Sequence, residues 1–190
     1  MNLPKAKSTK KGVQEQQAEN ERIRREVNAK KAKDFASKEY PGEKWSNPEP
    51  GIFVSEHQGR DKKILEKELV SARILKSKGS TVYILPENSR NQTKKVDAIV
   101  NGDYMELKTV IGGLNSVQKR FLESREQSRN VFINVTSNLE RRKVINQIAG
   151  ARQGPQYGKY NRFKGGKIII KLKDRENLIY LNVDSLKWEK

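Results

Sequence analysis

Two short hydrophobic segments, residues 94–100 and 103–110, carry charged side chains between their apolar residues and are joined by Asn101-Gly102. Asn-Gly between alternating segments predicts a β-hairpin, because a type I′ turn needs positive φ at both turn positions. In that register Asp97 lies directly opposite Glu106, and Lys108 points to the same face since side chains alternate along a strand. The other face then forms core, from Val96, Ala98, Val100, Met105 and Leu107.

Two opposed carboxylates repel each other, which costs stability unless something bridges them. A divalent cation such as Mg²⁺ is the natural bridge, being hard and oxygen-seeking. It would polarise a phosphate and lower the pKa of a bound water, while Lys108 could position that water or stabilise the pentavalent charge. The alternative is that Glu106, Lys108 and Lys95 are ordinary solvated residues on an exposed sheet face.

Asp97 followed by Glu106-Leu107-Lys108, with a hydrophobic strand on each side, resembles the PD-(D/E)XK nuclease motif, with Val96 in place of the motif's proline. The wider stretch holds a helix with Glu68 and Ala72, the strand VYILPE, and KKVDAIVNGDYMELKT. It resembles the nuclease domains at the C-termini of bacterial contact-dependent growth inhibition toxins. Similar modules occur in other polymorphic toxins and in proteins of phages and mobile elements.

The resemblance, over residues 60–135, implies a restriction-endonuclease-like fold and phosphodiester cleavage that depends on a divalent metal, Mg²⁺ first and Mn²⁺ or Zn²⁺ as alternatives. It implies transfer RNA or DNA as the substrate, an immunity protein that blocks the site, and action in the bacterial cytoplasm. It also implies a helical glutamate that completes the metal shell of Asp97 and Glu106. Glu68 matches this position better than Glu66, although either could be an exposed helix residue.

The chain carries 40 Lys and Arg against 23 Asp and Glu, a formal charge of +17, and residues 111–190 hold 17 basic and 7 acidic side chains. This excess indicates a surface for a polyanion, although it could also serve solubility or dock an acidic protein. Basic side chains that track phosphates, and aromatic ones that stack on bases, would suit RNA, unless they form a basic loop that binds nothing specific. The candidates for substrate binding are Gln118, Arg141, Arg142, Arg152, Tyr157, Lys159, Tyr160 and Arg162.

The composition argues against several other classes of protein. The sequence has no cysteine and one histidine, His57, which excludes disulfides, thiolate zinc sites and a cysteine nucleophile, and argues against a histidine dyad. No apolar run approaches the roughly 20 residues of a membrane span, and no secretory signal is visible at the N-terminus.

The surrounding pattern predicts an α/β (α+β) fold, a mixed sheet flanked by helices. Residues 1–50 form a basic arm, with disorder over 1–13, an exposed helix over 14–35 and a proline-rich loop over 40–50; the compact domain covers 51–190. Helices are expected at 61–78, 115–129 and 140–152, strands at 81–87 and 131–135, a loop at 153–166, and a closing hairpin at 167–173 and 178–183.

We therefore expect a metal-dependent nuclease, a toxin-type RNase that acts on transfer RNA. A first alternative is a DNA endonuclease of the same fold, since both substrates present phosphates. A second is a non-catalytic nucleic-acid-binding or adaptor protein. In a third, residues 14–36 dock a phage or secretion partner, and the nuclease is their cargo.

Overall fold

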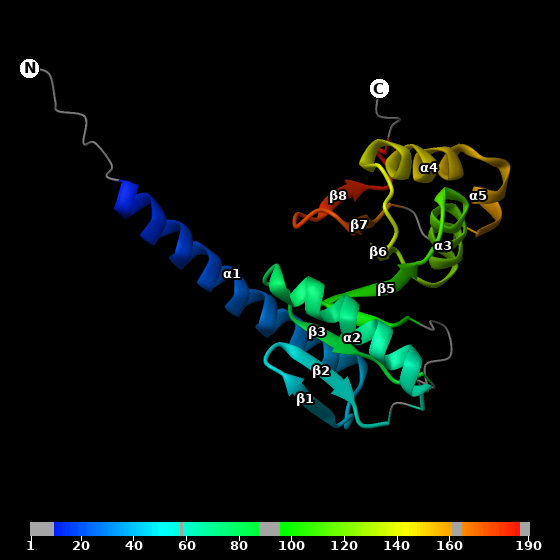
Figure 1. The fold of residues 1–190 in the computed structure, drawn as a ribbon. Coiled ribbons are helices and arrows are strands. Elements are labelled where there is room, and N and C mark those ends of the chain that lie inside the picture. Colours follow the sequence, from blue (N-terminus) through cyan, green and yellow to red (C-terminus); the bar gives the residue numbers. More distant parts are fainter. Residues whose placement is uncertain (1–9, 58, 88–95, 161–164, 187–190) are drawn as a thin grey trace, which may run out of the picture.

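A computed structural model of the chain describes residues 10–57, 59–87, 96–160 and 165–186. The fold is mixed α/β: one eight-stranded sheet has helices on both faces, and a long N-terminal helix extends away from it (Figure 1). The fold class predicted from the sequence is therefore confirmed. In the described residues no helix has the length and apolar character that a membrane span requires.

The strands lie in the sheet in the same order as in the chain. Strands β5, β6 and β7 run parallel to one another. The strands are β1 (Trp45–Glu49), β2 (Ile52–Ser55), β3 (Val82–Ile84), β4 (Ala98–Val100), β5 (Asp103–Val110), β6 (Asn130–Val135), β7 (Lys167–Leu172) and β8 (Ile179–Asn182). The helices are α1 (Lys10–Glu39), α2 (Lys62–Ser77), α3 (Leu114–Gln127), α4 (Arg141–Gln153) and α5 (Pro155–Tyr160).

The predicted hairpin forms between β4 and β5. Asn101 and Gly102 have φ angles of 53° and 87°, as a type I′ turn requires. Val100 pairs with Asp103, and the register continues to the pair of Ala98 with Met105, as counted from the sequence.

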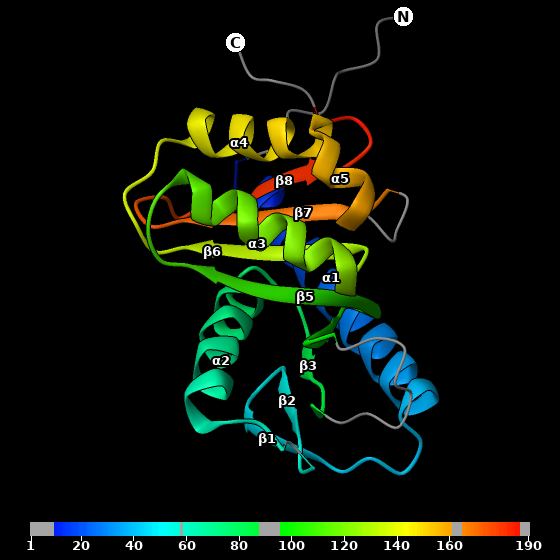
Figure 2. The same ribbon diagram turned by 90° about the vertical axis from the view of Figure 1, so that its right-hand side faces the viewer.

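Helices cover both faces of the sheet (Figure 2). On one face α3 and α4 pack over β5, β6 and β7, through side chains such as Phe121 and Ile133. The end of α1 continues this cover over β3 and β4, where Ala32 and Ala36 are buried. On the opposite face α2 packs through Leu75 against β3, β4 and β5. The middle of β5 is therefore enclosed from both sides, which buries Glu106 there.

Three local predictions are wrong. Residues 10–13 belong to α1 and are not disordered, although they include Gly12, a poor helix former. Part of the predicted loop 40–50 is strand β1, which tolerates Pro48 because it is an edge strand with an irregular register. Part of the predicted loop 153–166 is α5, which begins with Pro155, and proline is favoured at the first position of a helix.

Candidate active site

The candidate site begins where β5 extends past its hairpin partner. In the described part of the chain β4 pairs only with Asp103–Met105, so the rest of β5 has a free edge on that side. The Asp97 carboxylate fills part of this gap: the backbone N–H of Leu107 donates a hydrogen bond to Asp97 Oδ2 over 2.9 Å. This hydrogen bond fixes Asp97 beside β5, at the edge that β4 leaves unpaired.

Glu106 is fully buried on β5, in contact with the two residues predicted to join it. It forms an ion pair with Lys108 and shares a side-chain hydrogen bond with Asp97. Gln127, the last residue of α3, donates to Glu106 Oε2 over 3.0 Å when its amide nitrogen faces the carboxylate. The structure brings Asp97, Glu106 and Lys108 together, but the expectation that this face points away from the core is wrong for Glu106, because the helices of that face cover it.

One further detail of the predicted core face is wrong. Val96 packs with Ile99 and Tyr83 under α1, while Ala98 packs under α2 on the opposite face. The strict alternation assumed from the sequence does not reach Val96, since the ladder of β4 begins at Ala98.

Glu68 reaches the cluster from α2. Its carboxylate is buried and forms an ion pair with Arg60, whose side chain is 6% exposed and lies 3.7 Å from Asp97 Oδ1. The rival glutamate, Glu66, lies on the outer surface of α2, where it pairs with Arg73 over 3.0 Å. Between the two candidates, only Glu68 interacts electrostatically with Asp97 and Lys108 in the described residues.

Both buried glutamates hold their protons unusually tightly. Burial, followed by the charge of Asp97, raises the pKa of Glu106 to about 8 against the opposing effect of Lys108. Burial also raises the pKa of Glu68 to about 7, with Arg60 acting against it and Asp97 adding to it. Arg60 and Lys108 therefore do not fully offset the cost of ionising these neighbouring carboxylates, which water solvates poorly.

The chemistry of the donors fits a hard divalent cation. Glu106 on β5 and Glu68 on α2 each interact with Asp97, which directly precedes β4, and carboxylate oxygens are preferred ligands of Mg²⁺ and Mn²⁺. In the described residues, however, no three acidic or histidine side chains already form a coordination shell. The two basic side chains explain this, because Arg60 and Lys108 each hold one of the glutamates in an ion pair.

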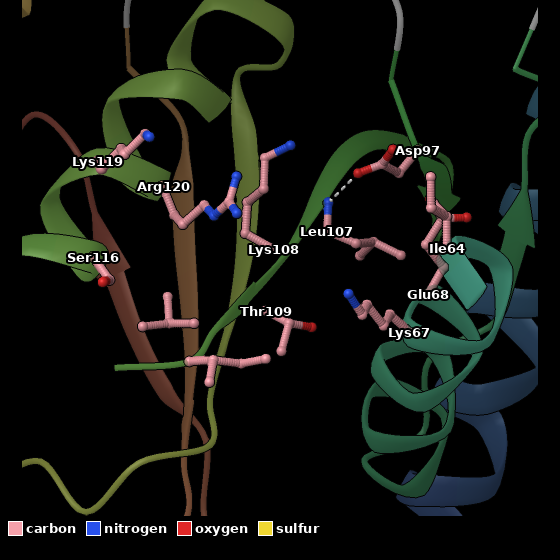
Figure 3. A pocket seen from close by; sticks show the side chains of 12 residues that line it. Ile64, Lys67, Glu68, Asp97, Leu107, Lys108, Thr109, Ser116, Lys119 and Arg120 are labelled. Carbon is pink, nitrogen blue, oxygen red and sulfur yellow. Dashed lines mark hydrogen bonds between the residues drawn. The ribbon is translucent and has the colours of Figure 1, made fainter. Parts of the chain in front are cut away.

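A cleft of about 540 Å³ opens beside this cluster, between α2 and α3 (Figure 3). Asp97, Glu68 and Lys108 lie on its wall, and Thr109 and Ser116 add hydroxyl groups. Three further cations line it from both helices: Lys67 on α2, and Lys119 and Arg120 on α3. The cleft thus combines a carboxylate cluster with a cationic rim of the kind that binds phosphates.

Most of the predicted substrate-binding residues lie away from this cleft. Gln118 bonds to Gln147 of α4 over 2.7 Å and lines a separate hollow between α3 and α4, together with Arg142. Arg141 lines another hollow near the end of β7. Arg152 donates to the backbone oxygens of Asp184 and Leu186.

The remaining candidates for substrate binding either pack in the core or lie outside the described residues. Tyr157 stacks on Phe121 with ring centroids 6.1 Å apart, and so packs against the core. The side chains of Lys159 and Tyr160, and the whole of Arg162, lie outside the described residues.

Sequence reasoning missed Arg60, Arg120 and Gln127. Arg60 sits in a loop and has no periodic pattern to place it, although it directly precedes Asp61, the N-cap of α2. A helix that connects two parallel strands crosses back over the sheet that they form. The helix expected after β5 should therefore cover β5, and its polar residues, such as Arg120 and Gln127, could have been listed as candidates on that ground.

Compared with known proteins, the chain matches no protein-family model and has no significant match among curated proteins or solved structures.

Proposed function

We propose that the protein is a divalent-metal-dependent nuclease that cleaves phosphodiester bonds in RNA, with transfer RNA as the favoured substrate. The observation that carries this proposal is that Glu68, Asp97 and Lys108 line one cleft with a cationic rim, while the buried Glu106 contacts Asp97 and Lys108 from behind it. Three neighbouring carboxylates and one lysine, beside a cleft with several cations, match what metal-assisted phosphodiester hydrolysis needs.

The carboxylates of Glu68, Asp97 and Glu106 would hold the cation. When bound, it would supply Lewis acidity toward the scissile phosphate and neutralise its charge. Lys108 lies beside Glu106 with 18% of its side chain exposed, so its ammonium group can donate to a non-bridging phosphate oxygen. That donation stabilises the extra negative charge as the attacking oxygen bonds to phosphorus and the opposite P–O bond breaks.

The rim residues would hold the substrate on either side of the reacting phosphate. Lys119 is 74% exposed and Arg120 47% exposed, and both lie one helical turn inside α3. Lys67 faces them from α2. A nucleic-acid backbone laid between the two helices would meet cations from both, which positions the chain without reading its sequence.

The cations at the start of α4 would extend this interaction. Arg141, Arg142 and Lys143 occupy the first turn of the helix, where the N-cap residue Glu140 pairs with Lys143. Cations at a helix N-terminus oppose the helix dipole, so their placement does not serve the helix itself. A phosphate group bound near them would relieve the repulsion, which supports an extended nucleic-acid substrate.

The resemblance to contact-dependent growth inhibition toxins leads us to propose a toxin role in the bacterial cytoplasm and a cognate immunity protein. An inhibitor of this site would be acidic, because it must cover Lys67, Lys119 and Arg120.

The test is incubation of the full chain with total bacterial RNA and with plasmid DNA, in Mg²⁺, Mn²⁺, Zn²⁺ or EDTA. The variant Asp97→Asn removes the charge and keeps an oxygen that can accept from Leu107. Asp103→Asn, at the other end of β5 and 61% exposed, removes a matched charge outside the site. We expect cutting of the transfer RNA band in the wild type and in Asp103→Asn, with metal only, and none in Asp97→Asn.

Other outcomes would change the assignment. Nicked plasmid beside intact RNA would favour the DNA endonuclease. No cutting in any lane, while the chain still binds RNA, would favour the non-catalytic binding module.

A further inference from the structure

One cation in the candidate site has no role in the proposed chemistry. Arg60 lies in the segment between β2 and α2, and its side chain is 6% exposed. It forms an ion pair with Glu68 and lies 3.7 Å from Asp97 Oδ1. A single side chain therefore engages two of the three carboxylates assigned to the metal.

A divalent ion bound at this cluster would have to share its carboxylates with Arg60. Glu68, Asp97 and Glu106 face two positive side chains, Arg60 and Lys108. A divalent ion held by the same carboxylates would lie close to the guanidinium group, and like charges repel strongly where water is largely excluded. Lys108 forms an ion pair with Glu106, whereas Arg60 engages both Glu68 and Asp97, so Arg60 competes for two of the three proposed ligands.

We propose that Arg60 occupies the cation position of this cluster in the metal-free protein and leaves it when a divalent ion binds. The ion pairs of Arg60 then compete with metal binding and lower the metal affinity of the site. This inference rests on the proposed metal dependence and adds to it a residue that controls loading. It also explains why the described carboxylates converge without forming a coordination shell.

The local backbone allows such a movement. Arg60 stands before the first turn of α2, outside the helical hydrogen bonds, and follows Gly59, which has a φ of 63°. Asp61 caps the helix through its own side chain, bonded to the backbone N–H of Lys63. The helix is therefore capped independently of Arg60, and the long arginine side chain can leave the carboxylates without unwinding α2.

The test measures Mn²⁺ binding to the purified full chain by electron paramagnetic resonance and by calorimetry, with no substrate present. Arg60→Gln removes the competing charge. Arg73→Gln is the matched control, because Arg73 also lies beside α2 glutamates but is 44% exposed and pairs with Glu49 and Glu66. We expect Arg60→Gln to bind Mn²⁺ about tenfold more tightly than the wild type, since a close cation changes the affinity of a carboxylate for a proton by at least that factor. The control should match the wild type.

Stability gives a second readout. Without metal, Arg60→Gln should melt at a lower temperature than the wild type, because Glu68 loses its buried counter-ion. Mn²⁺ should raise the melting temperature of Arg60→Gln more than that of the wild type. If Arg60→Gln does not fold without metal, Arg60→Lys decides: it keeps the charge but not the planar fork, and should bind Mn²⁺ more tightly than the wild type by a smaller factor.

The two proposals fail in different ways. If the wild type binds Mn²⁺ and the Arg60 variants bind it equally or more weakly, Arg60 is a structural ion pair and the metal-dependent nuclease still stands. If neither the wild type nor any variant binds Mn²⁺ at millimolar concentration, metal dependence is wrong, and the competition assigned to Arg60 fails with it.

Discussion

The cleft between α2 and α3 and the first turn of α4 both carry many charges, but they differ in burial. At the cleft, Glu68 on the wall and Glu106 behind it are buried, and their ionised forms are disfavoured by burial itself. At the start of α4 the cations are exposed, and Lys143 pairs with Glu140 in water, with side chains 57% and 65% exposed. An exposed charge costs little free energy and attracts opposite charges without fixing their position. A buried charge costs much more, unless an ion pair or hydrogen bonds compensate it.

The comparison separates two roles within one proposed nuclease. The buried cluster would set the rate of bond cleavage, because its groups are fixed and poorly screened. The exposed cations would set affinity, because they attract any phosphate chain and are weakened by salt. Substitutions in the two regions should therefore change different kinetic constants.

The largest effect is expected for Lys108→Ala. Loss of its ammonium group removes the donor to the reacting phosphate, so the single-turnover rate at saturating enzyme should fall by about 100-fold or more. The dissociation constant for RNA should change little. Lys173→Ala, an exposed lysine beyond β7, is the control and should keep the wild-type rate. A folded Lys108→Ala protein that cuts RNA at the wild-type rate would remove Lys108 from the mechanism.

The second effect concerns affinity. The double variant Arg142→Gln with Lys143→Gln should weaken RNA binding several-fold and lower the slope of log K against log salt by about 1 for each phosphate that the variant no longer binds. The rate at saturation should stay unchanged. The double variant Arg24→Gln with Lys30→Gln removes equal charge from the exposed side of α1 and serves as the control. Equal effects in both double variants would mean that net charge matters and the position on α4 does not.

The third effect is a pH dependence of stability. The pKa values of Glu68 and Glu106 are raised in the folded state, to about 7 and about 8, from 4.5. Between those values the folded protein binds more protons than the unfolded chain, so the free energy of unfolding should fall as pH rises from about 5 to about 8. Urea unfolding of the metal-free protein across this range measures it.

Glu106→Gln should flatten this dependence, because it removes the buried group with the higher pKa. Glu66→Gln is the control, since Glu66 is 62% exposed and lies outside the cluster. A wild-type protein whose stability rises from pH 5 to 8 would show that the two glutamates are ionised in the fold at little cost. Addition of Mn²⁺ should reduce the slope in the wild type, because a bound cation favours the ionised carboxylates.

The sequence predicts the local hairpin and its partners well, because turn chemistry and strand alternation are short-range rules. Asn101-Gly102 determines the register as far as the pair of Ala98 with Met105, which brings Asp97 beside the part of β5 that carries Glu106 and Lys108. Amphipathic spacing likewise predicts α2, which begins at Lys62, one residue after the expected start, and is capped by Asp61. Both elements can be predicted because they depend only on residues that are close in the sequence.

The features that the sequence could not predict depend on which elements lie over which face. The burial of Glu106 follows from the placement of helices over β5, and the position of Arg60 follows from the approach of the β2–α2 segment to β4. Neither feature can be predicted from the spacing of apolar residues within one helix or strand. For the same reason the basic stretch after residue 140 looked uniform in the sequence, although Arg142 lines an open hollow and Tyr157 packs on Phe121.

The smallest effect tests one member of that stretch. Arg152 donates over 2.9 Å to the backbone oxygen of Asp184 and over 3.1 Å to that of Leu186, and so ties α4 to the segment after β8. Arg152→Ala should lower the free energy of unfolding by about 1–2 kcal/mol, because it removes two partly exposed hydrogen bonds, each of which contributes about 0.5–1 kcal/mol net. Urea unfolding measures the decrease, and Lys143→Ala, which removes only a surface ion pair, should show none.

The same variant should leave the salt dependence of RNA binding unchanged, because a guanidinium group that is engaged by two carbonyl oxygens is not available to a phosphate. If Arg152→Ala instead keeps its stability and its salt slope falls by about one unit, Arg152 binds the substrate as the sequence suggested. The cationic surface would then extend from the first turn of α4 to its last, and the substrate would have to follow the whole length of the helix.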